Sequence, residues 1–125
     1  VELLENLVTK MGFTRITKTD CKTHDNKIGF TSQLCHVVAS AMVESAEDSS
    51  ITSFGGGSFE DLTRIAMINA PLWTELFLSN KEALLNHIKS FKEKITDIET
   101  LIKNDDAKNL ELLLKDVRQK RIEMI

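Results

Sequence analysis

The stretch that decides the fold is NKEALLNHIKSFKEKITDIETLIK, residues 80–103. Its apolar residues alternate steps of four and three, which is the spacing of a helix with one continuous apolar stripe. Ser79, followed three residues later by Glu82, predicts where this helix begins. The stripe is longer than one flanking helix of so small a domain needs, so we expect part of it to lie in a homodimer interface. Its members are Leu84, Ile88, Phe91, Ile95, Ile98 and Ile102.

The sequence on either side of this stretch also predicts helices. Upstream, apolar spacing indicates a helix over about 23–45, with Thr23 as its candidate N-cap. Ser58 begins a capping pattern for another helix, and Pro71 stands where the first residue of a further short helix is expected. Downstream, a last helix is expected from about Ala107. The predicted fold class is therefore all-α.

Length, charge and cysteine content exclude several classes of protein. The chain has 125 residues with 16 Lys+Arg and 19 Asp+Glu, a formal net charge of −3. It is long enough for one domain with its own core, and its slight acidity argues against binding to nucleic acid or to a membrane surface. No apolar run approaches the ~18 residues that span a bilayer. Cys21 and Cys35 suit neither a disulfide framework nor a zinc site, and no signal-peptide pattern opens the chain, so we expect a cytoplasmic protein without a metal.

Residues 1–19 differ in kind from the rest of the chain. Residues 1–11 have helical spacing, and Gly12 follows where a helix C-cap glycine belongs. Residues 13–19 (FTRITKT) read as a short strand, yet the rest of the chain offers no second strand to pair with it. On the residues alone this segment is either an edge segment or helical extension, or the tail of an α/β domain absent from this chain.

A row of small and polar residues lies beside the apolar face of the predicted helix over 23–45. Glycine and serine favour helices poorly, so their presence indicates that something approaches this row closely, either another helix or a ligand. His36 is the histidine we single out for binding, with a hydrogen-bonded core histidine as the alternative. His87 is expected at the surface of the long helix. The row consists of Asp25, Gly29, Ser32, His36 and Ser40.

A glycine run precedes the helix predicted to begin at Ser58. Residues 55–57 are all glycine and leave backbone N–H groups uncovered near a helix N-terminus, where an anion is favoured. Arg64, two turns into that helix, supplies a fork that binds a carboxylate bidentately. The run matches neither a dinucleotide fingerprint nor a P-loop. Alternatively, the glycines form only a turn and Arg64 is solvated.

Four motifs then follow one another along the chain. They are His24-Asp25, Ser32-Gln33-Leu34-Cys35-His36, the run from Gly55 to Ala66, and Leu72-Trp73 with Phe77 to Glu82. In this order they closely resemble the C-terminal helical domain of bacterial prephenate dehydrogenase, from about Asp20 onward. Residues 1–19 resemble the last helix and strand of that family's nucleotide-binding domain, which leaves 20–125 as a helical dimerisation and substrate-binding domain.

The resemblance implies a fold like the C-terminal domain of 6-phosphogluconate dehydrogenase, and a homodimer. Members of the family oxidatively decarboxylate prephenate to 4-hydroxyphenylpyruvate on the route to tyrosine, with hydride passing to NAD. The cofactor, NAD or NADP, and the catalytic histidine would belong mainly to an N-terminal Rossmann domain. This chain would then hold half an active site and be inactive alone. Two other interpretations stay open: an arogenate dehydrogenase domain, and a helical dimerisation module without a ligand.

The resemblance also implies roles for individual residues. Arg64 matches the arginine that holds a substrate carboxylate, and Ser32 and His36 match polar residues that face the substrate. Gln33 and Cys35 depart from the family's common Ser-His-Leu-Pro-His, and Gln33 keeps hydrogen-bonding capacity without titrating. The implied substrate-binding set is Arg64, His36, Ser32, Gln33, Gly57, Asp61 and Trp73.

Overall fold

The computed structural model describes Leu3, Asn6 and residues 20–124. Within these residues every regular element is helical, which confirms the all-α prediction. Leu3 and Asn6 are helical, whereas the rest of the helix predicted over 1–11 and the whole strand predicted over 13–19 lie outside the described residues. The elements are α2 (Cys21–Ile28), the π-helical turn η1 (Gly29–Leu34), α3 (Cys35–Glu44), the 3₁₀ turn η2 (Ser49–Phe54), α4 (Gly57–Thr63), the 3₁₀ turn η3 (Arg64–Ala66), α5 (Ala70–Ser79), α6 (Lys81–Lys103) and α7 (Ala107–Glu123).

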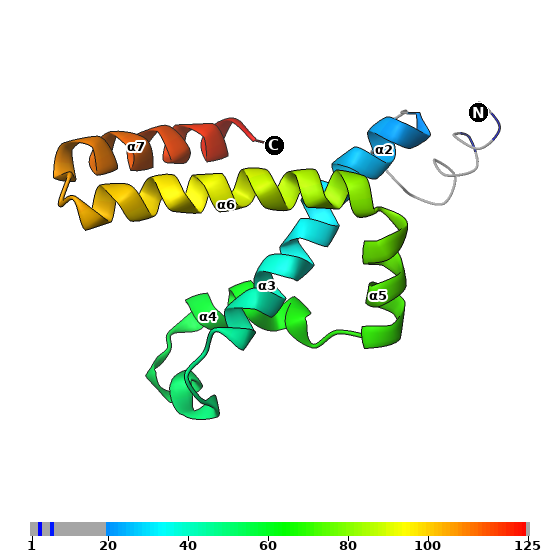
Figure 1. The fold of residues 1–125 in the computed structure, drawn as a ribbon, viewed down its shortest axis with the longest axis horizontal. Helices are drawn as coiled ribbons and strands as arrows, with labels where there is room; N and C mark the ends of the chain where they lie inside the picture. The colour runs from blue at the N-terminus through cyan, green and yellow to red at the C-terminus, as the bar shows by residue number, and fades with distance from the viewer. Residues whose placement is uncertain (1–2, 4–5, 7–19, 125) are drawn as a thin grey trace.

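The helices form an open arrangement around one crossing point (Figure 1). The segments α2, η1 and α3 run on as a single rod, and η1 packs against the N-terminal half of α6. The far end of α3 contacts α4 and η3, and α5 returns from there to the start of α6. From that point α6 extends away from the crossing, and α7 folds back along it as an antiparallel hairpin.

The rod begins three residues before the predicted cap, at Asp20 rather than at Thr23. The backbone of Asp20 is extended, and its carboxylate accepts a hydrogen bond of 2.7 Å from the N–H of Thr23. An aspartate in this position satisfies one of the N–H groups that the first turn leaves without a partner. Thr23 is therefore the residue that is capped, and the prediction that it caps the helix is wrong.

The start of α4 also differs from the prediction. The helix begins at Gly57 with Gly56 as N-cap and without a side-chain cap, so Ser58 lies inside the first turn. The helix ends at Thr63 after seven residues. Arg64 consequently opens the 3₁₀ turn that follows, rather than standing within a longer helix.

Helices α5 and α6 meet at a junction that the capping pattern misplaced by one residue. The carboxamide of Asn69 caps α5, and Pro71 lies in the first turn as its second residue. Ser79 is the last residue of α5 and donates its hydroxyl to the Leu76 carbonyl, so it does not cap α6. Asn80 is the N-cap residue of α6, but its side chain makes no capping bond and reaches α2 and η1 instead.

The turn between α6 and α7 closes with a paired set of backbone hydrogen bonds. The N–H of Asp106 donates to Leu101 and that of Asp105 donates to Ile102, which is the Schellman arrangement. Asp105 adopts a positive φ of 51°, a conformation that glycine accepts more readily. Asp106 then caps α7 by accepting the N–H of Asn109. The predicted start of the last helix at Ala107 is confirmed.

The buried core is small and sits at the crossing of η1, α3 and α6. Among the described residues, the buried apolar side chains are Leu34, Ala39 and Leu84, and many large apolar side chains on other helices are exposed. The described helices therefore leave many large apolar side chains at the surface. No helix in the described part of the chain is long and apolar enough to cross a bilayer.

Candidate functional site

The first group of predicted site residues surrounds His36, where Trp73 of α5 reaches α3. The His36 ring stacks on the indole of Trp73 with centroids 3.6 Å apart and planes inclined by 20°. Its Nδ1 lies 2.9 Å from the Ser32 carbonyl. Because a carbonyl only accepts, Nδ1 carries the proton in that contact, and Nε2 is the nitrogen left to meet a ligand. His36, Ser32 and Trp73 are each half-buried, so the site combines contact with the fold and access from outside.

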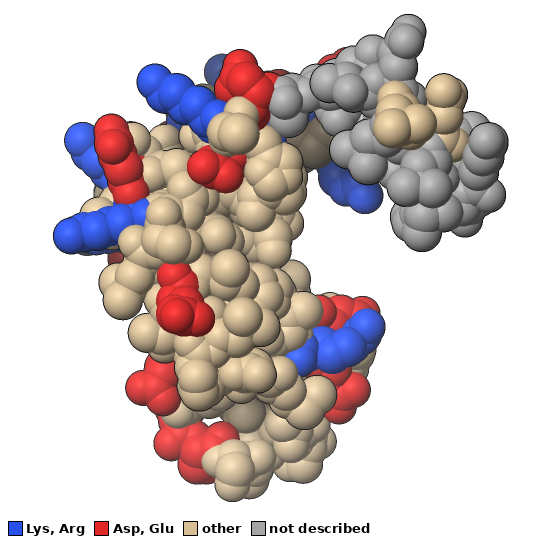
Figure 2. Space-filling model, turned by 90° about the vertical axis from the view of Figure 1, so that its right-hand side faces the viewer, with Lys and Arg blue, Asp and Glu red and all other residues tan. Residues whose placement is uncertain are grey.

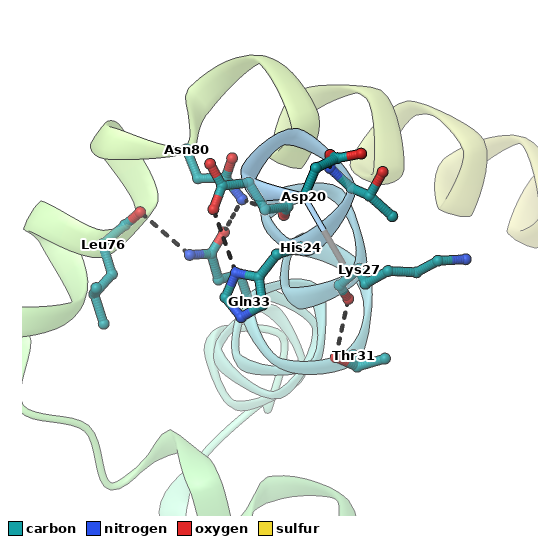
Figure 3. A network of polar contacts seen from close by, with 9 residues as sticks. Asp20, His24, Lys27, Thr31, Gln33, Leu76 and Asn80 are labelled. Carbon is teal, nitrogen blue, oxygen red and sulfur yellow. Dashed lines mark hydrogen bonds and ion pairs between the residues drawn. The ribbon is translucent and has the colours of Figure 1, made fainter. Parts of the chain in front are cut away.

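Gln33 lies next to Ser32 in sequence but belongs to a helix contact. Its side chain is 6% exposed. Its amide nitrogen donates to the Leu76 carbonyl over 3.4 Å, and its amide oxygen accepts from Asn80 Nδ2 over 2.8 Å (Figure 3). The side chain thus joins the π turn to the end of α5 and the start of α6. Its predicted contact with substrate remains a prediction.

The second group of predicted residues surrounds Arg64. The guanidinium Nη2 donates to Asp61 Oδ1 over 2.7 Å, and the two side chains are 68% and 71% exposed. A Cβ placed on Gly57 would meet Asp61 Oδ2 at 3.7 Å, an ordinary contact, so the carboxylate of Asp61 lies against this glycine. A guanidinium has five N–H donors, and Arg64 keeps donors for a second carboxylate beside Asp61.

Arg64 borders a hollow of about 580 Å³ between α3, η2, α4 and η3. Val43, Phe59 and Met67 line it with apolar surface, and among the described residues of its wall Arg64 is the only cation and Glu60 the only carboxylate. The charge around it is otherwise negative: Arg64 is the only Lys or Arg between Lys27 and Lys81. Figure 2 shows acidic side chains gathered over the end of the molecule that carries α4 and η2. Arg64 is therefore the residue of this wall whose charge could pair with an anion.

Two carboxyl groups at the ends of helices have lowered pKa values. The N–H and hydroxyl of Thr23 hold the pKa of Asp20 below its usual value, because both donate to the charged form. The hydroxyl and N–H of Ser50 lower the pKa of Asp48 in the same way at the start of η2. Both carboxylates are exposed caps, not members of either predicted group. Within the described residues, no three His, Cys, Asp or Glu side chains gather as metal ligands.

Two contributors to the site region escaped the sequence analysis. Asn80 reaches Asp25 and Gln33, and His87 lies 2.9 Å from the Asn26 carbonyl and edge-on to Phe30. His87 is thus half-buried in a contact with α2 and η1, whereas the sequence predicted only a surface position on the long helix. The signal was present in the spacing, because a helix brings residues three and four apart onto one face, and both flank the buried Leu84.

The same contact explains the glycine in the row of small and polar residues on the rod formed by α2, η1 and α3. A Cβ on Gly29 would lie 3.2 Å from Asn80 Nδ2 and 3.3 Å from His87 Cδ2. These distances are tighter than most side-chain contacts allow. At Gly29, the partner that approaches closely is thus another helix, α6, as one of the two interpretations proposed.

A comparison with known families identifies this arrangement of helices. A family model described as "Prephenate dehydrogenase, dimerization domain" matches residues 20–116. The chain belongs to the prephenate dehydrogenase dimerization-domain family. The match begins at Asp20, where the described helices begin, and it includes every residue of the two groups built above.

Relatives and solved structures agree with this family. Prephenate dehydrogenase of Lactococcus lactis is 32% identical over 107 residues, which cover 82% of this chain and 30% of that protein. The Bacillus subtilis prephenate dehydrogenase is 29% identical over 128 residues, covering 97% and 34%. This chain thus spans about a third of the length of these curated relatives.

A solved structure matches the fold over almost the whole chain. It is prephenate dehydrogenase from A. aeolicus in complex with hydroxyphenyl propionate and NAD+. The TM-score is 0.85 at 29% identity, and the match covers 99% of this chain and 45% of that one. The described helices therefore reproduce the helical domain of a prephenate dehydrogenase, which confirms the predicted architecture.

Proposed function

We propose that this chain is the dimerisation and substrate-binding part of an enzyme that oxidatively decarboxylates prephenate to 4-hydroxyphenylpyruvate. Hydride passes to NAD or NADP, which a Rossmann domain on the N-terminal side of this chain holds together with the catalytic histidine. Residues 1–19 are the end of that domain in this proposal, and 20–125 are the helical domain. The homologous A. aeolicus enzyme, whose structure holds NAD+ and a hydroxyphenyl acid, supports the choice of ligand class.

The observation that carries the proposal is Arg64 on the wall of the hollow. Prephenate has two carboxylates, and Arg64 is the only cation lining that space. The guanidinium already holds Asp61 in place, and its remaining donors suit a carboxylate of the substrate. Gly57 leaves the space beside Asp61 uncovered by a side chain of its own.

Ser32 and His36 have polar roles in the same proposal. With Nδ1 committed to the Ser32 carbonyl, His36 offers Nε2 to the substrate. Trp73 holds the imidazole plane by stacking and forms an apolar wall beside it. These residues bind and orient the substrate, and none is assigned the chemical step. The site holds no metal ligand set in this proposal, and the enzyme works in the cytoplasm.

A second copy of the chain completes the protein in this proposal. The helices α6 and α7 bear apolar side chains that the rest of the described chain leaves about half exposed, among them Ile95, Ile102 and Leu114. Shallow apolar hollows lie along both helices, lined by Ile95, Ile98 and Ile102 on α6 and by Leu110 and Leu114 on α7. Burial of such surface between two copies is the main favourable term in association.

Steady-state kinetics of the intact enzyme with Arg64→Ala test the function. A charged hydrogen bond to a carboxylate contributes ~1.5–3 kcal/mol, so kcat/KM for prephenate should fall on the order of 10- to 150-fold. The loss should appear mainly in KM if Arg64 anchors ground-state binding. Arg64→Lys should recover part of it, because the charge returns without the fork.

The control is Arg121→Ala, which removes an exposed arginine at the far end of α7 and should leave the kinetics unchanged. Unchanged kinetics of Arg64→Ala in a folded dimer would overturn the role of Arg64. Parallel assays with arogenate identify the alternative substrate, which differs by an amino group on the side chain. If neither compound is oxidised by an intact enzyme that dimerises, the chain is a dimerisation module without this activity.

A further inference from the structure

The wide turn of η1 changes how the backbone carbonyls around it are satisfied. A π-helical turn moves N–H groups away from the carbonyls that an α-helix would pair with them, and such turns occur often at functional sites. Side chains add donors to several carbonyls in and around this turn. The Thr31 hydroxyl donates to the Lys27 carbonyl over 2.9 Å, and His36 Nδ1 contacts the Ser32 carbonyl at the same distance.

Two further donors come from α6. At the end of α2, the N–H of Gly29 is shared between the carbonyls of Asp25 and Asn26. Asn80 Nδ2 donates to the first of these carbonyls over 2.9 Å, and His87 Nε2 lies 2.9 Å from the second. Asn80 and His87 are seven residues apart, which is two turns, so they lie on the same face of α6.

Asn80 has a second partner within the turn itself. The same Nδ2 group donates to the buried Gln33 amide oxygen over 2.8 Å, and Gln33 passes the connection on to the Leu76 carbonyl (Figure 3). The carboxamides of Asn80 and Gln33 together thus link α2, η1 and the end of α5. The contact is close because Gly29 has no side chain between the two helices.

We propose that Asn80 and His87 are positioning residues that hold the π turn open and so set where Ser32 and His36 stand. The turn ends at Leu34 and α3 begins directly after it at Cys35, so His36 is the second residue of α3. A return to α-helical pairing rotates and shifts everything after it relative to α5, which carries Trp73. The consequence for substrate binding rests on the proposed function, whereas the placement of His36 against Trp73 does not.

The placement of His36 against Trp73 is measured by a double-mutant cycle on the 125-residue chain, with Trp73 fluorescence as the readout. Trp73 is its only tryptophan and stacks on His36, so His36→Ala changes the emission of Trp73 in the parent chain. The same substitution is then made in an Asn80→Asp background. Aspartate has the shape of asparagine but cannot donate to the Asp25 carbonyl or to Gln33.

If Asn80 positions His36, the emission change caused by His36→Ala should fall by about half or more in the Asn80→Asp background. Asn86→Ala is the matched control, an exposed asparagine on α6 that makes none of these bonds. It should leave the emission change intact. An emission change that is the same in the Asn80→Asp and parent backgrounds overturns the proposal.

His87→Phe is a second, independent test of the proposal. It replaces Asn80→Asp if far-ultraviolet circular dichroism shows that Asn80→Asp prevents folding. Phenylalanine keeps a ring against Phe30 but cannot donate to Asn26. It too should shrink the effect of His36→Ala, and an unchanged effect in the folded variant counts against the proposal.

Kinetics of the intact enzyme with Asn80→Asp separate this proposal from the proposed function. A raised KM for prephenate with kcat little changed is expected if both are right. If the fluorescence cycle shows coupling while KM stays unchanged, positioning stands and the substrate role of His36 falls. If the cycle shows no coupling, positioning falls whatever the kinetics show.

Discussion

The two halves of α6 carry the same apolar stripe and meet different surroundings. In the first half, Leu84 is 4% exposed because η1 packs directly against it. In the second half, Ile102 of the same stripe is 59% exposed, although α7 runs alongside. The same apolar stripe is thus buried by other segments of the chain at the N-terminal end of α6 and left exposed at its C-terminal end. The exposed second half is the surface that we propose a second copy covers, while the first half packs against η1 beside the candidate site.

The largest effect should come from Leu84→Ala in the packed half. Removing a buried leucine side chain and leaving a cavity typically costs ~2–5 kcal/mol of unfolding free energy. Urea denaturation of the chain and its variant measures this change. Ile102→Ala is the matched truncation in the other half and should cost much less at concentrations where the chain is monomeric. Equal losses for the two variants would contradict the contrast between the halves.

Charges placed on the exposed half should dissociate the dimer without unfolding it. Carboxylates introduced by Ile95→Asp with Ile102→Asp would have to be desolvated in the interface, so the dimer dissociation constant should rise about 100-fold or more. Sedimentation at micromolar concentration is the measurement. Thr100→Asp adds a charge to the opposite side of the same helix and should leave the dimer intact. A parent chain that sediments as a monomer would remove the basis for the comparison.

The turn that ends α6 offers a smaller, stabilising change. Asp105 has a positive φ in the Schellman position where glycine is preferred. Asp105→Gly should raise the unfolding free energy by ~0.5–1 kcal/mol, because the native backbone conformation no longer strains a side chain. The midpoint of urea denaturation should shift upward. Asn104→Gly, at a residue with an ordinary φ of −90°, should not stabilise the chain.

The smallest effect concerns acid and the Asp20 cap of α2, the helix that leads into the π turn packed on the first half of α6. The pKa of Asp20 is lowered by Thr23, so the charged carboxylate is the form that stabilises the start of α2. That stability is fully present above the ordinary aspartate pKa of about 3.9 and is lost as pH falls through the lowered value. Exchange of the Thr23 amide should therefore show extra opening in acid. Asp20→Asn, which accepts without titrating, should flatten this dependence.

How much the sequence predicted can be judged from particular residues. Periodicity placed α6 over its observed length and α7 at its observed start, because these long helices are specified by local spacing. Capping patterns failed at Thr23, Ser58 and Ser79, each by one to three residues. A neighbouring residue was a competing cap in each case, and the choice between them depends on the path of the chain outside the helix.

In the candidate site, too, local contacts could be predicted from the sequence and contacts between distant helices could not. The motifs identified the family, and Arg64 and Asp61 are three apart in sequence, so their contact follows from local geometry. The stack of Trp73 on His36 joins helices that are far apart in the chain, and no local pattern specifies it. The contacts of the Gln33 amide with Leu76 and Asn80 likewise join segments that are far apart in sequence, and its expected contact with substrate stays a prediction.

By itself the sequence determined the helical class, the long stripe of α6 and the family to which the chain belongs. These properties depend on residue types at fixed spacings, which act within one or two turns of a helix. Only the tertiary structure decided that Asn80 and His87 meet the π turn and that the stripe is buried at Leu84 but not at Ile102. The reason is that burial and side-chain partners depend on which distant segment packs against a helix face. The sequence of one segment alone does not specify that packing, because it depends on both segments together.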